Sequence, residues 1–262
     1  KSGNTVTDKV YFAHRNLGDS DIYFLNNHSK NVFKDSIRLR TTATNAEFWD
    51  PTTGKQFVLP VTASGKEGLL LDVVLQPNES GFIVTSNQNL ANLPTKSMNI
   101  EEKVTSIEGD WKVFFDPKWG GPGEVTFTNL TEWNQNEDKR IKYYSGTAVY
   151  KKTITLDKSV LDKQLLLRFT QLGAIARVLI NGKEASTVWC SPWEADITPY
   201  IKNGENTLEI QVVNSLTNRM IGDASLPQSE RFTYAFPEIV TPAASLVPSG
   251  IVDKVLLVKR MK

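Results

Sequence analysis

The 262-residue chain is predicted to be all-β, with a β-sandwich domain followed by a second, larger β-sandwich of the jelly-roll type. Short apolar segments recur along the whole chain, turn residues separate them, and no stretch keeps a convincing helical period. Hydrophobic residues make up 40% of the sequence and charged residues 23%, which supplies enough apolar material for packed cores. The length fits one large or two medium β domains.

The first part of the chain, to about residue 85, contains the strands of the smaller sandwich. Residues 33–40 alternate with period two, since one parity holds Phe33, Asp35, Ile37 and Leu39 and the other holds the charged or polar Lys34, Ser36, Arg38 and Arg40. This pattern is typical of a half-buried strand. Further strands are expected at residues 10–15, 21–27, 46–49, 69–75 and 82–85, with turns rich in Asn, Pro and Gly between them.

A polar stretch at about residues 87–103 loses the alternation and is interpreted as a linker. We therefore place the smaller domain at residues 1–95 and the jelly roll at residues 96–262. Strands of the second domain are expected at residues 109–115, 143–156, 165–170, 176–181, 207–214 and 252–258. Helix is expected to be scarce, with a single turn at residues 159–163.

Two turns in the second domain can be predicted from their residue types. Asn181-Gly182 is a hairpin signal, because both residue types accept positive φ. Asn206 is expected to hold the turn that begins at Asn203 through bonds from its side chain to the backbone.

Charge and hydropathy exclude some functions. The chain has 30 basic and 29 acidic residues, a net charge of +1, which argues against nucleic acid as the main partner. No apolar run approaches the roughly 20 residues of a membrane span. The polar start, Lys1-Ser-Gly-Asn-Thr, has no signal-peptide pattern, so we expect a mature form or an excised fragment.

Cysteine and histidine are too few for several kinds of site. Cys190 is the single cysteine, which excludes an internal disulfide. A thiolate nucleophile needs a partner such as histidine, and both His14 and His28 lie in the first domain. One cysteine and two histidines give no zinc-ligand spacing either. Cys190 is therefore interpreted as an ordinary packed side chain.

The second domain resembles the sugar-binding domain of family 2 glycoside hydrolases, a galactose-binding-like jelly roll. The motifs that carry this resemblance keep their order and spacing over about residues 111–214. They are Tyr144-Ser-Gly-Thr-Ala-Val-Tyr-Lys-Lys-Thr-Ile, Val178-Leu-Ile-Asn-Gly, Ser191-Pro-Trp193, Asp196-Ile-Thr, Gly204-Glu-Asn-Thr-Leu and Val213-Asn214.

The whole chain is similar to the C-terminal region of family 106 α-L-rhamnosidases. Three features carry this second resemblance: the segments at residues 11–27, Glu47-Phe-Trp-Asp-Pro-Thr-Thr-Gly, and Asn218-Arg-Met-Ile-Gly-Asp223. The resemblance implies a secreted or periplasmic enzyme for plant or bacterial polysaccharide, whose catalytic barrel precedes domains of this kind. The barrel and its carboxylates are missing from this sequence. We expect a non-catalytic region that supports the catalytic domain of the same protein and contacts carbohydrate.

Two alternatives stay open at this point: a free-standing carbohydrate-binding module without hydrolytic activity, and a purely structural pair of domains. Hydrolysis by this chain alone is disfavoured. A pair of acidic groups about 5 to 9.5 Å apart is needed, with one buried beside the substrate, and no Asp or Glu stands in such a context.

Aromatic residues in loops are the candidate carbohydrate-binding residues, because the C–H faces of sugars stack on aromatic rings. The residues of this kind are Trp119, Trp133, Tyr143, Trp189 and Trp193. The other interpretation of each is packing against its own loop or a neighbouring domain. Trp49 and Trp111 are assigned to the cores.

A segment after a predicted strand, residues 218–223, adds polar candidates. If it projects as a loop, Asn218, Arg219 and Asp223 can contact sugar hydroxyls or the barrel. The alternative for Arg219 and Asp223 is an internal ion pair that braces the loop. No cofactor is expected with certainty. Jelly rolls of the resembled type often carry structural calcium, but no Asp-x-Asp-x-Asp-Gly loop occurs here, so a metal site is left open.

Overall fold

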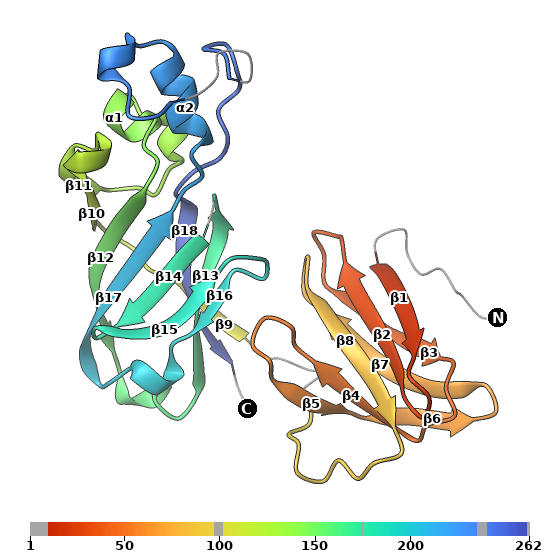
Figure 1. Ribbon diagram of the computed structural model, residues 1–262. Coiled ribbons are helices and arrows are strands. Elements are labelled where there is room, and N and C mark those ends of the chain that lie inside the picture. The colour runs from red at the N-terminus through yellow and green to blue at the C-terminus, as the bar shows by residue number, and fades with distance from the viewer. Residues whose placement is uncertain (1–9, 97–101, 174, 235–239, 261–262) are drawn as a thin grey trace. The chain divides into compact units, whose positions relative to one another are not determined.

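The computed structural model describes residues 10–96, 102–173, 175–234 and 240–260 (Figure 1). The predicted linker lies partly outside these ranges, at residues 97–101. Contacts divide the chain into two compact units, unit 1 at residues 1–100 and unit 2 at residues 101–262. The two units are described separately below.

Unit 1 is built from two antiparallel sheets. The five-stranded sheet has the order β1 (Val10–Asn16), β2 (Asp21–Asn27), β8 (Ser80–Ser86), β4 (Asn45–Trp49), β5 (Gln56–Leu59). The three-stranded sheet has the order β3 (Phe33–Leu39), β7 (Gly68–Leu75), β6 (Val61–Gly65). Their inner faces share one apolar core that includes Tyr23, Phe48, Leu71 and Ile83. Gly81 allows the Phe48 ring to lie against its Cα, because a Cβ there would clash with the ring.

The outer face of the five-stranded sheet carries a row of aromatic side chains. Phe24, Phe82 and Trp49 are cross-strand neighbours on β2, β8 and β4, and the centroids of the two Phe rings are 5.1 Å apart. Trp49 is 37% exposed, and its Nε1 donates to Oε2 of Glu47 at 2.7 Å. The assignment of Trp49 to a core is therefore wrong, because its parity on β4 is opposite to that of Phe48.

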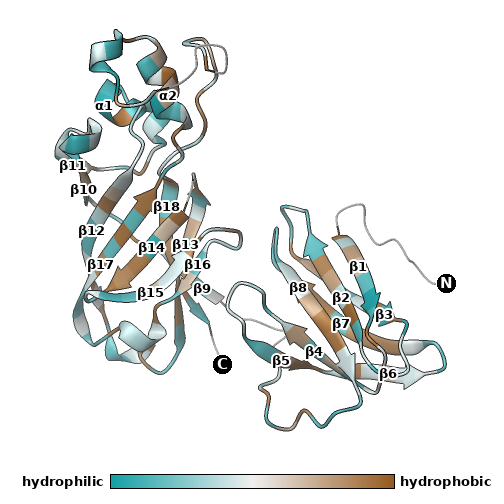
Figure 2. Cartoon of the chain, in the orientation of Figure 1, coloured by the Kyte–Doolittle hydropathy of each residue, from teal (hydrophilic) through white to brown (hydrophobic). Residues whose placement is uncertain are grey.

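Unit 2 is a larger sandwich of two antiparallel sheets. One has the order β11 (Gly123–Phe127), β10 (Trp111–Phe115), β12 (Thr147–Leu156), β17 (Gly204–Val213), β14 (Ile175–Ile180), β15 (Lys183–Val188). The other has the order β16 (Glu194–Asp196), β13 (Gln164–Leu172), β18 (Ile251–Arg260), β9 (Glu102–Ser106). Figure 2 shows hydrophobic residues recurring along these strands. The predicted all-β fold class is confirmed.

The core of unit 2 draws side chains from both sheets. On β10, buried Trp111, Val113 and Phe115 alternate with exposed residues, as a half-buried strand requires. They share the core with residues of β13 and β18 such as Phe169 and Val255.

The two predicted turns have the expected geometry. Asn181 and Gly182 connect β14 to β15 with φ of 52° and 76°. Asn206 is fully buried; its Oδ1 accepts from the Lys202 amide, and its Nδ2 donates to the carbonyls of Lys202 and Gly204. Both predictions about these residues are confirmed.

Helical elements are few among the described residues. The turn expected at residues 159–163 is a 3-10 turn at Lys158–Val160, η3. Two short α-helices were not predicted: α1 (Lys139–Lys142) and α2 (Thr217–Ala224). Further 3-10 turns occur at η1 (Pro117–Trp119), η2 (Trp133–Gln135), η4 (Thr198–Tyr200) and η5 (Gln228–Glu230). None of the helices described is long and apolar enough to cross a membrane.

Candidate functional site

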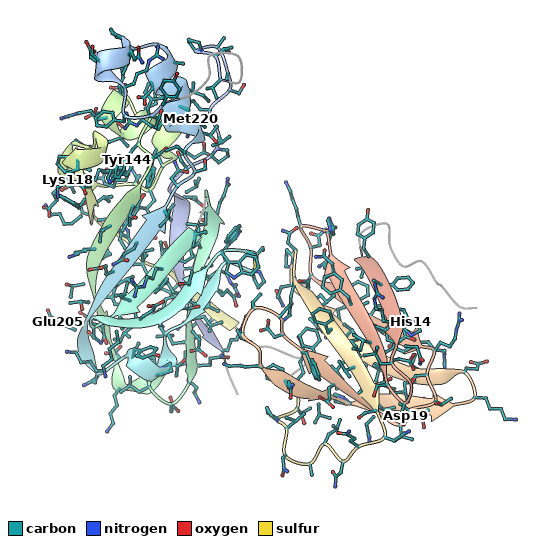
Figure 3. The ribbon with its side chains drawn as sticks, in the orientation of Figure 1. His14, Asp19, Lys118, Tyr144, Glu205 and Met220 are labelled. Atoms are coloured by element: carbon teal, nitrogen blue, oxygen red, sulfur yellow. The ribbon has the colours of Figure 1, made fainter. Side chains whose placement is uncertain are left out.

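The two α-helices of unit 2 lie beyond one end of its strands, and this end holds four of the predicted site residues. Figure 1 shows α1 and α2 together there. In Figure 3, Lys118, Tyr144 and Met220 lie at this end, whereas Glu205 lies at the opposite end of unit 2. We call this region the α2 end, defined by η1, α1, α2 and residues 231–234.

Trp119 is an exposed aromatic of the α2 end, as are Phe232 and Tyr234. It closes η1, which Asp116 begins by accepting a hydrogen bond from the Lys118 amide at 2.9 Å. Gly120 ends the turn with a φ of 75°, a left-handed conformation that suits glycine. Trp119 is 54% exposed, so its indole face is accessible to a ligand.

Arg219 joins three segments of the α2 end. Its Nη2 donates to the Trp119 carbonyl at 3.1 Å, and its guanidinium carbon lies 4.8 Å from the centroid of the Phe232 ring. Gly120 permits this packing, because a Cβ at that position would fall 2.8 Å from the Phe232 ring. Arg219 is only 7% exposed. Burial lowers the pKa of Arg219, and the nearby Asp223 carboxylate opposes that effect.

Asp223 lies one helical turn after Arg219 and is 1% exposed. Its Oδ2 accepts two hydrogen bonds from Thr233, from the amide and from Oγ1, each 2.7 Å long. Its Oδ1 lies 3.8 Å from Nη1 of Arg219. Within the described residues, Oδ1 of Asp223 and Nε of Arg219 are buried without a hydrogen-bond partner.

The structure decides between the two interpretations of residues 218–223, a projecting loop and an internal ion pair. Residues 217–224 form α2 and do not project as a loop; the buried residues of this helix are Asn218, Arg219, Ile221 and Asp223. Arg219 and Asp223 do form an internal pair, but it is buried and incompletely satisfied.

A small pocket of about 70 Å³ adjoins Asp223. Its apolar walls come from Met220, Ala224, Val240 and Pro242, and its polar groups from Asp223, Thr233 and Arg231. Arg231 donates from Nε to the Leu226 carbonyl at 2.8 Å.

Two further predicted residues support α2 without offering a binding surface. Tyr143 is half-buried, and its ring lies against Gly222, where a Cβ would fall 2.6 Å from Cγ. Asn218 is fully buried, and its amide group exchanges two hydrogen bonds of 2.8 Å with the backbone of Val247. The prediction that Asn218 binds carbohydrate is therefore corrected, because its side-chain amide is hydrogen-bonded to the backbone of Val247.

The prediction that the Trp133 ring binds carbohydrate is also corrected. Its ring is fully buried beneath the α2 end and packs edge-on against Phe115 and Tyr144. Its Nε1 donates to the Tyr150 hydroxyl at 2.6 Å. Both faces of the ring are covered by unit 2, so a sugar has no access to it in this fold.

Trp189 and Trp193 lie on the connection between β15 and β16, a different part of unit 2 from the α2 end. Trp189 is 60% exposed, whereas Trp193 is half-buried and packs on the core. Cys190 between them is half-buried. The described residues contain no group of three or more His, Cys, Asp or Glu side chains placed to hold a metal ion.

Sequence reasoning missed two members of the α2 end, Phe232 and Thr233. The segment Arg231-Phe-Thr-Tyr234 is the one signal that could have indicated them, because it places two exposed aromatics in a stretch without strand pattern.

A family model described as glycosyl hydrolases family 2, sugar binding domain, matches residues 88–259, well over half of the chain. The chain belongs to this family. A second model, described as alpha-L-rhamnosidase, matches residues 1–61. The resemblance to both families is confirmed, and the residues that match the family 2 sugar-binding domain cover unit 2 up to residue 259.

Two similar proteins are much longer than this sugar-binding region. A putative beta-glucuronidase of Formosa agariphila is 36% identical over 164 residues, which are 60% of this chain and 14% of that protein. The solved structure of a rhamnosidase from Novosphingobium sp. PP1Y is 29% identical with a TM-score of 0.84, over 98% of this chain and 24% of that one. The chain thus spans less than a quarter of either relative.

Proposed function

We propose that this chain is the accessory region of a glycoside hydrolase that acts on α-L-rhamnosides, and that its α2 end contacts the glycan. The match of residues 1–61 to the alpha-L-rhamnosidase model and the likeness of 98% of the chain to a solved rhamnosidase support the substrate class. The sugar-binding family of unit 2 supports the contact with carbohydrate.

One observation carries the choice of the α2 end: the Trp119 side chain is 54% exposed there, and its backbone carbonyl is anchored by a hydrogen bond from the buried Arg219. An aromatic face attracts the C–H groups of a sugar ring. The pocket of about 70 Å³ at the same end adds polar groups from Arg231 and Thr233. Binding sites combine an apolar surface with a few convergent polar groups in this way.

The proposed partner is the catalytic domain of the same protein, which would supply the pair of carboxylates that glycoside hydrolysis requires. This chain would then orient the substrate or hold the catalytic domain. Because polysaccharide is found outside the cytoplasm, we also propose a secreted or periplasmic location for the enzyme, which cell fractionation can test.

Titration calorimetry of the chain with rhamnose-containing oligosaccharides tests the contact. We expect Trp119→Ala to weaken binding by about tenfold, the effect of losing one ring contact of ~1 kcal/mol or more. Trp189→Ala is a matched control with similar exposure, and it should bind like the unchanged chain.

Three outcomes separate the candidate functions. No binding to any oligosaccharide would reject the proposal and leave the purely structural interpretation. Binding lost with Trp189→Ala instead would move the contact to the β15–β16 connection. Glycan binding by a full-length protein that hydrolyses no rhamnoside would favour a free-standing binding module.

A further inference from the structure

Among the described residues, the edge strand β1 pairs with β2 alone, and its other edge is free. The pairing runs over all seven residues, Val10–Asn16, without a shift in register. Six of these residues are exposed, whereas β2 contains no exposed residue. The free edge therefore presents a regular row of backbone N–H and C=O groups that can pair with another strand.

The side chains of β1 expose aromatic rings on both faces of the sheet. Phe12 lies opposite Leu25 and so points to the core side, yet it is 61% exposed, whereas Leu25 is 6% exposed. The smaller sheet has three strands against five, and β1 makes no extensive contact with any of those three. Tyr11 points to the opposite face and is 60% exposed, and Leu17, directly after β1, is exposed as well. Large apolar side chains exposed close together are typical of a surface that another chain or domain covers.

Two other edges of unit 1 are protected, which sets β1 apart. At the far edge of the same sheet, the Val58 amide of β5 donates to the Pro94 carbonyl at 2.8 Å, and the Lys96 amide donates to the Val58 carbonyl at 2.9 Å. β3, an edge of the smaller sheet, carries the charged side chains of Lys34, Asp35 and Arg38. Natural sheets protect their edges with such cover and charges, or with proline and bulges. β1 contains no lysine, proline or bulge, and its one arginine, Arg15, is next to its end.

The rest of the same polypeptide is the partner that the comparisons favour. The solved rhamnosidase resembles 98% of this chain, and the match covers only 24% of that protein, so most of it lies outside this region. β1 lies within residues 1–61, the part that matches the alpha-L-rhamnosidase model. A segment on the same polypeptide acts at an effective concentration of about 1 mM, far above that of a second, separate chain in dilute solution.

We infer that the free edge of β1 binds a β-strand of the catalytic domain of the same protein, and that apolar side chains of that strand cover Phe12. The inference rests on the proposed function and deepens it, because it names the surface that contacts the proposed partner. In strand addition of this kind, main-chain hydrogen bonds supply affinity, and side-chain contacts at alternate positions supply specificity. Phe12 is the side chain that selects the partner, because it stands at a core position that unit 1 leaves uncovered.

Hydrogen exchange followed by mass spectrometry tests the pairing without any substrate. It compares the 262-residue chain with the full-length protein that contains it, over peptides that include β1. In the chain alone, the β1 amides that point away from β2 should exchange rapidly at every protein concentration. In the full-length protein they should exchange about 100-fold more slowly, because a hydrogen-bonded amide exchanges only when its strand opens.

Variants of the full-length protein test the role of Phe12. Phe12→Lys places a charge against the apolar side chains of the partner, so the β1 amides should exchange about tenfold faster than in the unchanged protein. Phe12→Leu keeps an apolar side chain and should retain most of the protection. Phe114→Lys is the matched control, because Phe114 is 43% exposed on β10 in unit 2; it should leave β1 exchange unchanged. Full protection in Phe12→Lys would reject the role of Phe12.

The outcomes separate this inference from the proposed function. Equal exchange of β1 in the two proteins rejects the inference. Protection in the chain alone also rejects it, since the cover would come from the chain's own residues or, at high concentration only, from a second copy. Protection in a full-length protein that hydrolyses no rhamnoside would reject the proposed substrate and leave the strand contact, and a gene that encodes no further domain rejects both. Should a variant fail to fold, the comparison of the two unchanged proteins still decides.

Discussion

Arg219 on α2 donates a hydrogen bond from Nη2 to the main-chain oxygen of Trp119, 3.1 Å away and 100 positions earlier in the chain. The same guanidinium packs on the ring of Phe232. One buried cation therefore fixes the position of three segments that share no strand pairing. The exposed indole of Trp119 is positioned through the hydrogen bond to its backbone carbonyl.

Removal of this cation should destabilise unit 2. Arg219→Met leaves Asp223 buried without a counter-charge, so we expect a loss of ~3 kcal/mol in the free energy of unfolding. Adding Asp223→Asn should recover part of that loss, because the unpaired charge is gone. Urea unfolding followed by tryptophan fluorescence measures this. A double variant less stable than Arg219→Met would contradict the ion-pair account.

The buried hydrogen bond between Trp133 and Tyr150 gives a second prediction. Tyr150→Phe leaves the indole N–H of Trp133 buried without an acceptor, which should cost about 1–3 kcal/mol. Tyr143→Phe removes a hydroxyl from a half-buried ring and is the control, with an expected change below ~0.5 kcal/mol. Equal losses for the two variants would show that the 2.6 Å bond contributes little.

Gly250 and Gly182 provide a matched pair of glycines. Both have positive φ, 83° and 76°, but a Cβ at Gly250 would fall 2.6 Å from Cδ1 of Trp133, whereas a Cβ at Gly182 meets nothing within 4 Å. Alanine at either position pays the left-handed backbone cost of about 1–2 kcal/mol. Gly250→Ala should lose a further ~1–3 kcal/mol from overpacking. Thermal unfolding measures the difference, and similar melting temperatures would disprove the close contact.

Asn206 is expected to be critical for the turn between η4 and β17. Its side chain makes three bonds to the backbone of residues 202–204 and accepts a fourth from Nδ2 of Asn181 at 2.9 Å. Asn206→Ala should cost about 2–4 kcal/mol, since several buried partners lose their bonds together. The exposed Asn203→Ala should be nearly neutral in the same denaturation experiment.

Acid should weaken unit 1 through Asp21. Burial raises the pKa of Asp21, but hydrogen bonds from Asn16, Thr41 and His14 together hold it below the ordinary value of 3.8. A lowered pKa in the folded state means that the carboxylate stabilises the fold above pH 3.8, and that this contribution is lost as the pH falls through the folded-state pKa.

The measurement is thermal unfolding by circular dichroism as a function of pH, from about 5 down to about 2. The melting temperature of the unchanged chain should fall steadily over this range. The Asp21→Asn variant should have a lower melting temperature at pH 5 and a smaller fall. Asp19→Asn, at an exposed neighbouring position, should keep the full pH slope. An identical slope for Asp21→Asn would remove Asp21 as the cause.

Local pattern predicted the strands and turns, because period-two alternation and Asn-Gly are properties of neighbouring residues. The alternation at residues 33–40 corresponds to β3, and Asn206 closes its turn as expected. Exposure of single aromatics was harder to predict. Trp133 stands in a polar stretch yet is buried, because its neighbour across the fold is Gly250, 117 positions later in the sequence. Such a contact has no local signal.

The α2 end was predicted in its residues but not in its structure. Arg219 and Asp223 were chosen for their charge and their place after a strand, and the structure brings Arg219 to the Trp119 carbonyl and Asp223 to Thr233. The helix itself has little apolar signal, since Ile221 is the one apolar residue among its buried side chains; a helix places residues four apart, such as Arg219 and Asp223, on one side. The packing of Phe232 and Thr233 against them depends on tertiary structure and could not be inferred.

The pairing of β9 with β18 has a consequence for synthesis. β9 opens unit 2, and its partner β18 holds the last described residues of the chain, Ile251–Arg260. β18 also lies between β9 and β13 in its sheet. On a ribosome, the strands of unit 1 are complete once β8 has emerged, but unit 2 must wait with its apolar strands exposed until β18 emerges. Of the two units, nascent unit 2 is therefore the one whose apolar strands stay exposed longer during synthesis.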